Sequence, residues 1–140
     1  MNRVILWDAS ALLRLLWASE RSPEVYAQAE RMIENGDDLR TVVHSLRECY
    51  ATLTRPVAAN GYAVSVPQAR GMIESLGRRS TITLLPDPPQ AYGYWLDLCE
   101  RQQVRGILCH DAYLAACVLT LDVPIYALDR DFARFGVRTP

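Results

Sequence analysis

The sequence predicts an α/β fold in which three layers, α/β/α, are built around a central, mainly parallel sheet. Short apolar runs alternate along the chain with longer segments whose apolar residues recur at helical spacing. This alternation is typical of parallel strands joined by helices that cover both faces of a sheet. The length of 140 residues predicts that one domain spans 1–140.

The N-terminal half is expected to supply two strands and four helices. Residues 4–7, VILW, form a continuous apolar run, as in a strand that is buried on both faces. Ser22-Pro23 begins a helix favourably and Gly36 ends one, while Ser65 has capping-box spacing to Gln68. The expected order is strand 4–7, helix 11–17, helix 22–36, strand 41–43, a helix from 44 or 45 to about 56, and a helix from 65 onward.

The C-terminal half is expected to supply three strands, 82–85, 107–109 and 125–128, and two helices. The first helix opens at 87–89, and the second spans 111–121. The second is apolar on every side, which predicts a position in the middle of the molecule. The earlier helix 11–17 also carries more apolar surface than one buried face needs. Two interpretations stay open for it, a core helix or a helix at an interface.

The amino-acid composition predicts the cellular compartment of the protein better than it predicts its function. The net charge is −1 and all fifteen basic residues are Arg, which indicates composition bias rather than a nucleic-acid surface. The four cysteines form no C-x-x-C pair, so we expect buried thiols in a reducing compartment and no zinc site among them. No apolar run is long enough to span a membrane, and Asp8 interrupts the N-terminal run too early for a signal peptide. We therefore expect a cytoplasmic protein.

Three carboxylates share one position relative to the predicted strands. Asp8, Asp111 and Asp129 each follow an apolar run, at the point where the chain should leave the core. Because the carboxyl ends of parallel strands meet at one edge, we expect these side chains to converge where open α/β sheets bind ligands. Each residue alone has an ordinary explanation as a helix cap or a turn residue. Three caps, however, have no reason to converge.

Convergent carboxylates have an electrostatic consequence. Two of them about 4 Å apart repel by about 4 kcal/mol at an effective dielectric constant of about 20. Their pKa values would rise unless a cation were bound between them. Oxygen ligands suit Mg²⁺ or Mn²⁺, and such ions in proteins usually act on phosphate groups.

Four segments carry a resemblance to a known family. The motifs ILWDASALL, HSLRECYATLTRP, GILCHDAYLAA and YALDRDF follow one another in this order within the chain. Together they resemble the PIN-domain ribonucleases, most closely the VapC toxins of type II toxin–antitoxin systems, and the resemblance spans Val4 to Phe135. It implies a PIN-like fold and Mg²⁺- or Mn²⁺-dependent endoribonuclease activity, in which an activated water leaves a 5′-phosphate and a 3′-hydroxyl. It also implies three partners: an RNA substrate, a small cognate antitoxin and a second copy of the chain.

The resemblance implies roles for individual residues as well. The catalytic and metal-binding residues would be the acids at the family's acidic positions: Asp8, Glu48, Asp111 and Asp129. Asp131 would be an alternative ligand or a neighbour of the metal, and Ser10 would support Asp8. The candidates for contacts with the RNA backbone are the arginines near these positions in the sequence: Arg47, Arg55, Arg130 and Arg134. His44 is interpreted as a helix-start residue. His110 is interpreted as a capping or packing residue, with a contact to phosphate or a role as a base as the alternative.

Two features depart from the family pattern or from what periodicity supports. Ala127 stands where the family usually has Thr or Ser, which leaves open whether Asp129 alone or the pair Asp129/Asp131 serves the metal. On a helical wheel Glu48 falls nearly opposite the apolar stripe of its helix, so periodicity alone indicates a solvated side chain. Two other functions therefore stay open: a non-catalytic module that binds RNA or protein, and a housekeeping nuclease of RNA maturation.

Overall fold

The structure is a computed structural model that describes residues 3–16, 22–78, 82–128 and 130–140, with the backbone alone at residues 77, 78, 130 and 131. In these residues four strands form one sheet, and all neighbouring strands run parallel. The strands are β1 (Val4–Trp7), β2 (Asp38–Val42), β3 (Thr83–Leu85) and β4 (Ile125–Tyr126). Their order across the sheet is β3-β2-β1-β4, so the chain leaves β1 toward one edge and returns as β4 on the other side.

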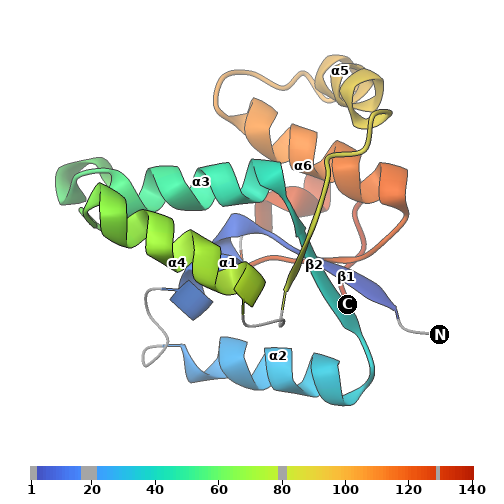
Figure 1. Cartoon of the computed structure of the whole chain (residues 1–140). Helices are drawn as coiled ribbons and strands as arrows, with labels where there is room; N and C mark the ends of the chain where they lie inside the picture. Colours follow the sequence, from blue (N-terminus) through green and yellow to red (C-terminus); the bar gives the residue numbers. More distant parts are fainter. Residues whose placement is uncertain (1–2, 17–21, 79–81, 129) are drawn as a thin grey trace.

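Helices cover both faces of this sheet, which confirms the predicted three-layer α/β/α fold. In Figure 1, α2 lies on one side of β1 and β2, and α5 and α6 lie on the other. The α-helices are α1 (Ala9–Leu16), α2 (Pro23–Glu34), α3 (Val43–Thr54), α4 (Val66–Arg78), α5 (Ala91–Arg101) and α6 (Leu108–Leu121), and two 3₁₀ turns are η2 (Val57–Ala59) and η3 (Arg130–Phe135).

The side chains of β1 alternate between the two apolar layers. Ile5 and Trp7 pack with Leu12 of α1 in one cluster, whereas Leu6 packs with Leu114 of α6 in another. All five side chains are at most 1% exposed. A strand that is apolar at every position is expected for a sheet buried on both faces, as the run VILW predicted. The helix α6 is buried through its middle, as its apolar sequence also predicted.

The strand predicted at 107–109 is wrong, because these residues enter α6. Ile107 has helical dihedral angles and is 86% exposed, which no buried strand residue would be. Gly106 turns the chain just before it, with a φ of 60° in the left-handed region that favours glycine. Three apolar residues fit the first turn of a helix as well as they fit a strand. Asp111 therefore lies in the first turn of α6 and does not follow a strand.

The first helix begins earlier than the predicted range of 11–17. It starts at Ala9 because the backbone carbonyl of Asp8 already accepts the N–H of Leu12, at 3.0 Å. Ala11 and Leu12 are fully buried, which supports the core interpretation for this part of the helix. Trp17 lies outside the described residues.

The starts of α3 and α4 follow from the local sequence. The sheet passes into α3 without a loop, because Val42 is the last residue of β2 and also the N-cap of α3, with extended dihedrals of φ −114° and ψ 159°. The predicted capping box of α4 is confirmed: the Ser65 hydroxyl accepts the N–H of Gln68 at 3.3 Å and donates to its side-chain oxygen at 3.0 Å.

Among the described helices, none combines the length and apolar character that a membrane span requires.

Candidate active site

A cavity of about 640 Å³ opens at the carboxyl end of β1. The strand order reverses here, with β2 on one side of β1 and β4 on the other, and open α/β sheets bind ligands at such points. The polar residues of its lining come from α1, α3 and α6: Asp8, Ser10, His44, Arg47, Glu48, Thr52, Arg55, His110 and Asp111. The fold thus brings together three acids that are far apart in sequence: Asp8, Glu48 and Asp111.

Asp8 is the residue that joins β1 to α1. It is 4% exposed, and its Oδ1 accepts the Ser10 hydroxyl at 2.7 Å and the N–H of Ala11 at 3.1 Å. A carboxylate that accepts an amide from the first turn of a helix is a capping residue. Asp8 therefore both caps α1 and lines the cavity, because the start of α1 faces the cavity.

The ionised form of Asp8 is disfavoured in this position. The pKa of Asp8 is raised to about 6: burial and the negative charge of Glu48 raise it, while the hydrogen bonds from Ser10 and Ala11 lower it. Burial is the largest of these causes. A cation beside the carboxylate would offset both the lost hydration and the repulsion by Glu48.

Ser10 connects the ends of two strands. Its hydroxyl donates to Asp8 and also accepts the N–H of Leu128, at 3.0 Å. Leu128 lies two residues after the end of β4, so one hydroxyl fixes the segment after β4 to the carboxylate after β1.

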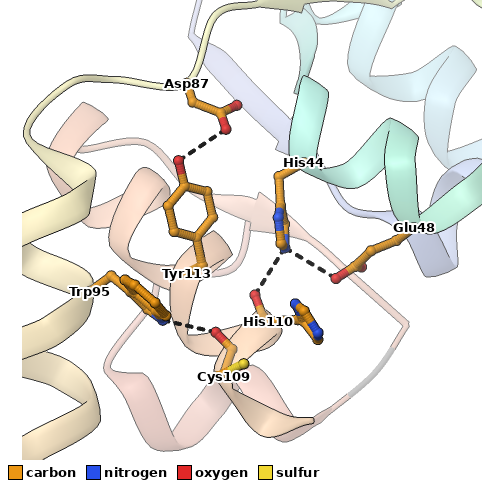
Figure 2. A network of polar contacts seen from close by, with 7 residues as sticks. All are labelled: His44, Glu48, Asp87, Trp95, Cys109, His110 and Tyr113. Carbon is orange, nitrogen blue, oxygen red and sulfur yellow. Dashed lines mark hydrogen bonds and ion pairs between the residues drawn. The ribbon is translucent and has the colours of Figure 1, made fainter.

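Glu48 faces the cavity from α3 and is not an ordinary solvated side chain. Its side chain is 33% exposed, and its Oε1 lies 3.1 Å from Nε2 of His44, one helical turn earlier. Nε2 of His44 also lies 3.1 Å from the backbone carbonyl oxygen of His110. Figure 2 shows His44 between Glu48 and the start of α6. The imidazole therefore links the two helices that carry Glu48 and Asp111.

The first turn of α6, which carries Asp111, is held by neighbouring aromatic residues. The indole N–H of Trp95 donates to the carbonyl of Cys109 at 3.0 Å. The hydroxyl of Tyr113 donates to Asp87 at 3.0 Å, and its ring contacts the His44 ring with centroids 4.8 Å apart. These contacts are drawn together in Figure 2. They position α6 without a strand, which is why Asp111 reaches the cavity although the predicted strand is wrong.

The remaining predicted residues differ in what the structure says of them. Asp129 lies outside the described residues, and the side chains of Arg130 and Asp131 are likewise not described. Arg47 lines the cavity. Arg134 does not belong to the cavity lining: its guanidinium donates to the carbonyl of Gln102 at 2.9 Å.

Sequence reasoning missed the position of both histidines in this cavity. His44 is 4% exposed and lies against Glu48, and His110 lines the same cavity from α6. The position of His44 could have been inferred from its spacing to Glu48, because residues at i and i+4 occupy the same face of a helix. No sequence pattern joins His44 to His110, since their contact depends on how α3 and α6 pack.

The acidic lining has the donor chemistry of a divalent metal site. Asp8, Glu48 and Asp111 offer carboxylate oxygens, which are the ligands that Mg²⁺ and Mn²⁺ prefer. The raised pKa of Asp8 indicates the same need for positive charge. These residues fit the metal that the resemblance implies.

Several solved structures share this fold. VapBC2 from Rickettsia felis, bound to a promoter DNA fragment, has a TM-score of 0.72 and 11% identity, over 97% of this chain and 96% of that chain. VapC20 from Mycobacterium tuberculosis, a sarcin-ricin loop cleaving toxin, has a TM-score of 0.64 and 18% identity, over 95% of each chain. VapBC-1 from nontypeable Haemophilus influenzae has a TM-score of 0.67 and 18% identity, over 98% of this chain and 96% of that chain. No curated protein matches the chain.

The family itself is shown by a match to the sequence. The family model described as PIN domain matches residues 5–137. This range includes every residue that lines the cavity and the whole sheet except Val4. The solved structures agree with this match in fold. The chain therefore belongs to the PIN domain family.

Proposed function

We propose that this chain is a metal-dependent endoribonuclease and the toxin of a type II toxin–antitoxin system. The observation that carries the proposal is Asp8, a carboxylate buried at the carboxyl end of β1 in a cavity that it shares with Glu48 and Asp111. Burying an acid beside another acid is unfavourable for folding, so such a site is expected where a cation is needed. Membership of the PIN domain family supports a hydrolase that acts on nucleic acid.

The metal-binding residues in this proposal are Asp8, Glu48, Asp111 and Asp129, with Asp131 as an alternative to Asp129. When bound, Mg²⁺ or Mn²⁺ would lower the pKa of a water and offset charge on the phosphodiester. Asp8 supplies a carboxylate whose orientation is fixed by Ser10 and Ala11. Glu48 supplies one that lies beside His44 and is partly exposed.

The cationic residues of the cavity would position the RNA. Arg47 and Arg55 line it from α3, one on each side of Ala51, and guanidinium groups bind phosphate in a bidentate manner. Such contacts fix the backbone of a nucleic acid without reading its sequence. Arg130 and Arg134 remain candidates for contacts outside the cavity.

The toxin role is proposed from the structural relatives. Two of those compared above are VapBC structures, and the third is a toxin that cleaves the sarcin-ricin loop. We accordingly expect a small cognate antitoxin, a second copy of this chain, and action on cytoplasmic RNA. A short gene directly upstream of the one that encodes this chain would favour the toxin over a housekeeping nuclease.

The test is cleavage of a mixed RNA pool by the purified chain, freed of any partner. We expect cutting with Mg²⁺ or Mn²⁺, none with EDTA, and a loss of about 100-fold or more in Asp8→Asn, which keeps the shape of the cap but removes a ligand charge. Asp97→Asn, an exposed acid on α5, is the matched control and should cut as the wild type does. A folded, partner-free chain that cuts nothing with either metal would contradict the proposal.

A further inference from the structure

The two histidines of the chain meet at one place in the cavity. The sequence contains only two, His44 and His110, on different helices. A ring nitrogen of each and a carboxylate oxygen of Glu48 all lie within 4.8 Å of one another. Figure 2 shows the His110 ring beside Nε2 of His44 and the Glu48 carboxylate. The resemblance and the family match give no role to either imidazole.

The three side chains differ in how firmly they are held. His44 is 4% exposed, its ring is fixed against Tyr113, and its Nε2 faces the cavity with Oε1 of Glu48 at 3.1 Å. His110 is exposed and Glu48 is 33% exposed at its side chain, so both can rotate. Ligands of one tetrahedral metal ion lie roughly 3.3 Å apart, given metal–ligand distances of about 2.0 Å. The exposed side chains can rotate to reach this separation, while Nε2 of His44 would exchange its contact with the backbone carbonyl oxygen of His110, at 3.1 Å, for the metal.

The donor set selects a class of metal. Two imidazole nitrogens and one carboxylate oxygen are typical ligands of Zn²⁺, Co²⁺ and other transition metals, whereas Mg²⁺ prefers oxygen alone. Three protein ligands also leave at least one position open to water or to a phosphate oxygen. His44 and Glu48 stand at i and i+4 on α3, the spacing that puts two ligands on one face of a helix.

We propose that His44, Glu48 and His110 form a transition-metal site of the Zn²⁺ and Co²⁺ class, distinct from the all-carboxylate site of Asp8 and Asp111. Glu48 is the only residue common to both. The new site goes beyond the proposed ribonuclease function and does not rest on it, because metal binding can be measured without RNA. It gives His44 a function beyond packing, and it explains why a buried imidazole points at a carboxylate on the wall of a cavity.

The experiment uses the full chain without an affinity tag, so that every imidazole signal comes from these two residues. The histidine rings are labelled with ¹⁵N, and their NMR resonances are followed while Zn²⁺ is added. We expect both rings to change and the change to be complete near one equivalent. Resonances that do not change, or that change for one ring only, would overturn the proposal.

A second measurement removes the proposed ligand His110. Co²⁺ binding is followed by its visible absorption in the wild type and in His110→Ala, an exposed position where folding should not depend on the side chain. We expect binding to weaken about tenfold or more in His110→Ala, and the ¹⁵N changes on Zn²⁺ to persist in Asp8→Asn. Equal Co²⁺ affinity in His110→Ala would mean that His110 does not bind the metal and would overturn the proposal.

Competition with Mg²⁺ separates the two sites. Millimolar Mg²⁺ should leave Co²⁺ on the imidazoles, because nitrogen is a poor ligand for Mg²⁺. Complete displacement of Co²⁺ by Mg²⁺ would overturn the proposal. The ribonuclease proposal fails independently of this one, since a chain that cuts no RNA would still show both histidines bound to Zn²⁺.

Discussion

The two walls of the cavity fix their functional groups in different ways. The first wall, called the strand wall here, consists of the buried Asp8 after β1 and the partly buried Ser10 at the start of α1. Both are attached to backbone: Asp8 accepts an amide of α1, and Ser10 accepts the amide of Leu128. The helical wall, which comprises His44, Glu48, His110 and Asp111, depends on packing between α3 and α6. The strand wall gains a fixed geometry at a cost in stability, because its carboxylate is desolvated. The helical wall keeps Glu48 hydrated and adjustable.

The largest expected effect tests the stability cost of the strand wall. The folded-state pKa of Asp8 is raised to about 6 by burial, so the folded chain prefers the neutral acid. At a pH below the ordinary pKa of an aspartate, Asp8 is neutral in the folded and unfolded states, so its burial costs no stability through ionisation. Above pH 6 the folded state must hold a buried negative charge, which lowers the free energy of unfolding. Asp8→Asn should therefore be more stable than the wild type at pH 7.5, by up to about 3 kcal/mol, and the gain should disappear near pH 4.

Urea unfolding in EDTA at the two pH values measures this difference, since a bound metal would mask it. Asp97→Asn is the control and should shift neither value. A gain that stays constant between pH 4 and pH 7.5 would show that the effect does not come from ionisation of Asp8.

A change in the helical wall should lower activity without raising stability. We expect Glu48→Gln to lower the RNA cleavage rate by about 10-fold or more, because a metal ligand charge is lost. Its free energy of unfolding should change by less than about 0.5 kcal/mol, since the side chain is partly exposed and its pairing with His44 is of the weak kind. A thermal unfolding curve beside the rate assay checks both values. A large stability gain in Glu48→Gln would erase the contrast with Asp8.

Ser10 tests whether the strand wall is fixed by its hydroxyl. Removing it in Ser10→Ala leaves the N–H of Leu128 without its acceptor, while Asp8 loses the hydroxyl donor and keeps the N–H of Ala11. We expect a loss of about 1 kcal/mol in unfolding free energy and a smaller fall in cleavage than in Asp8→Asn. Ser10→Thr retains a hydroxyl and should recover part of both; equal losses in the two variants would assign the effect to packing instead.

The smallest effect concerns the rim of the helical wall. Arg47 is exposed and lines the cavity, so Arg47→Gln should raise the KM for RNA and leave kcat nearly unchanged. The dependence of log KM on log salt should become shallower by about 0.7, the value for one lost phosphate contact on single-stranded RNA. A fall in kcat with an unchanged salt slope would place Arg47 in charge balance with the carboxylates rather than in RNA binding.

Much of the fold follows from local patterns in the sequence. The run VILW predicts a doubly buried strand, Ser65 with Gln68 predicts a helix start, and the apolar 111–121 segment predicts a central helix; the structure bears out each. The strand at 107–109 fails because a short apolar run does not distinguish a strand from a helical turn. What decides the outcome there is the left-handed turn at Gly106.

The site is predictable in part for the same physical reasons. Asp8 could be placed from its position after an apolar run, because the end of a parallel strand has a defined location. Asp111 was expected at the right edge for an incorrect reason, since it arrives there at the start of a helix. Periodicity placed Glu48 in solvent, because a helical wheel does not show that the other side of α3 faces a cavity. The pairing of His44 with the carbonyl of His110 depends on interhelical packing alone, so no local pattern encodes it.

The absence of a loop between β2 and α3 has a consequence for how this chain tolerates change. Val42 ends the strand and caps the helix, so the direction of every side chain on α3 is coupled to the register of the sheet. One inserted residue at this junction would rotate the helix by about 100°. Glu48 and His44 would then turn away from the cavity, and the buried Cys49 and Leu53 on the same helix would turn out of the core with them. Single-residue insertions at this junction should therefore cost stability as well as activity, and length variation among relatives should concentrate elsewhere.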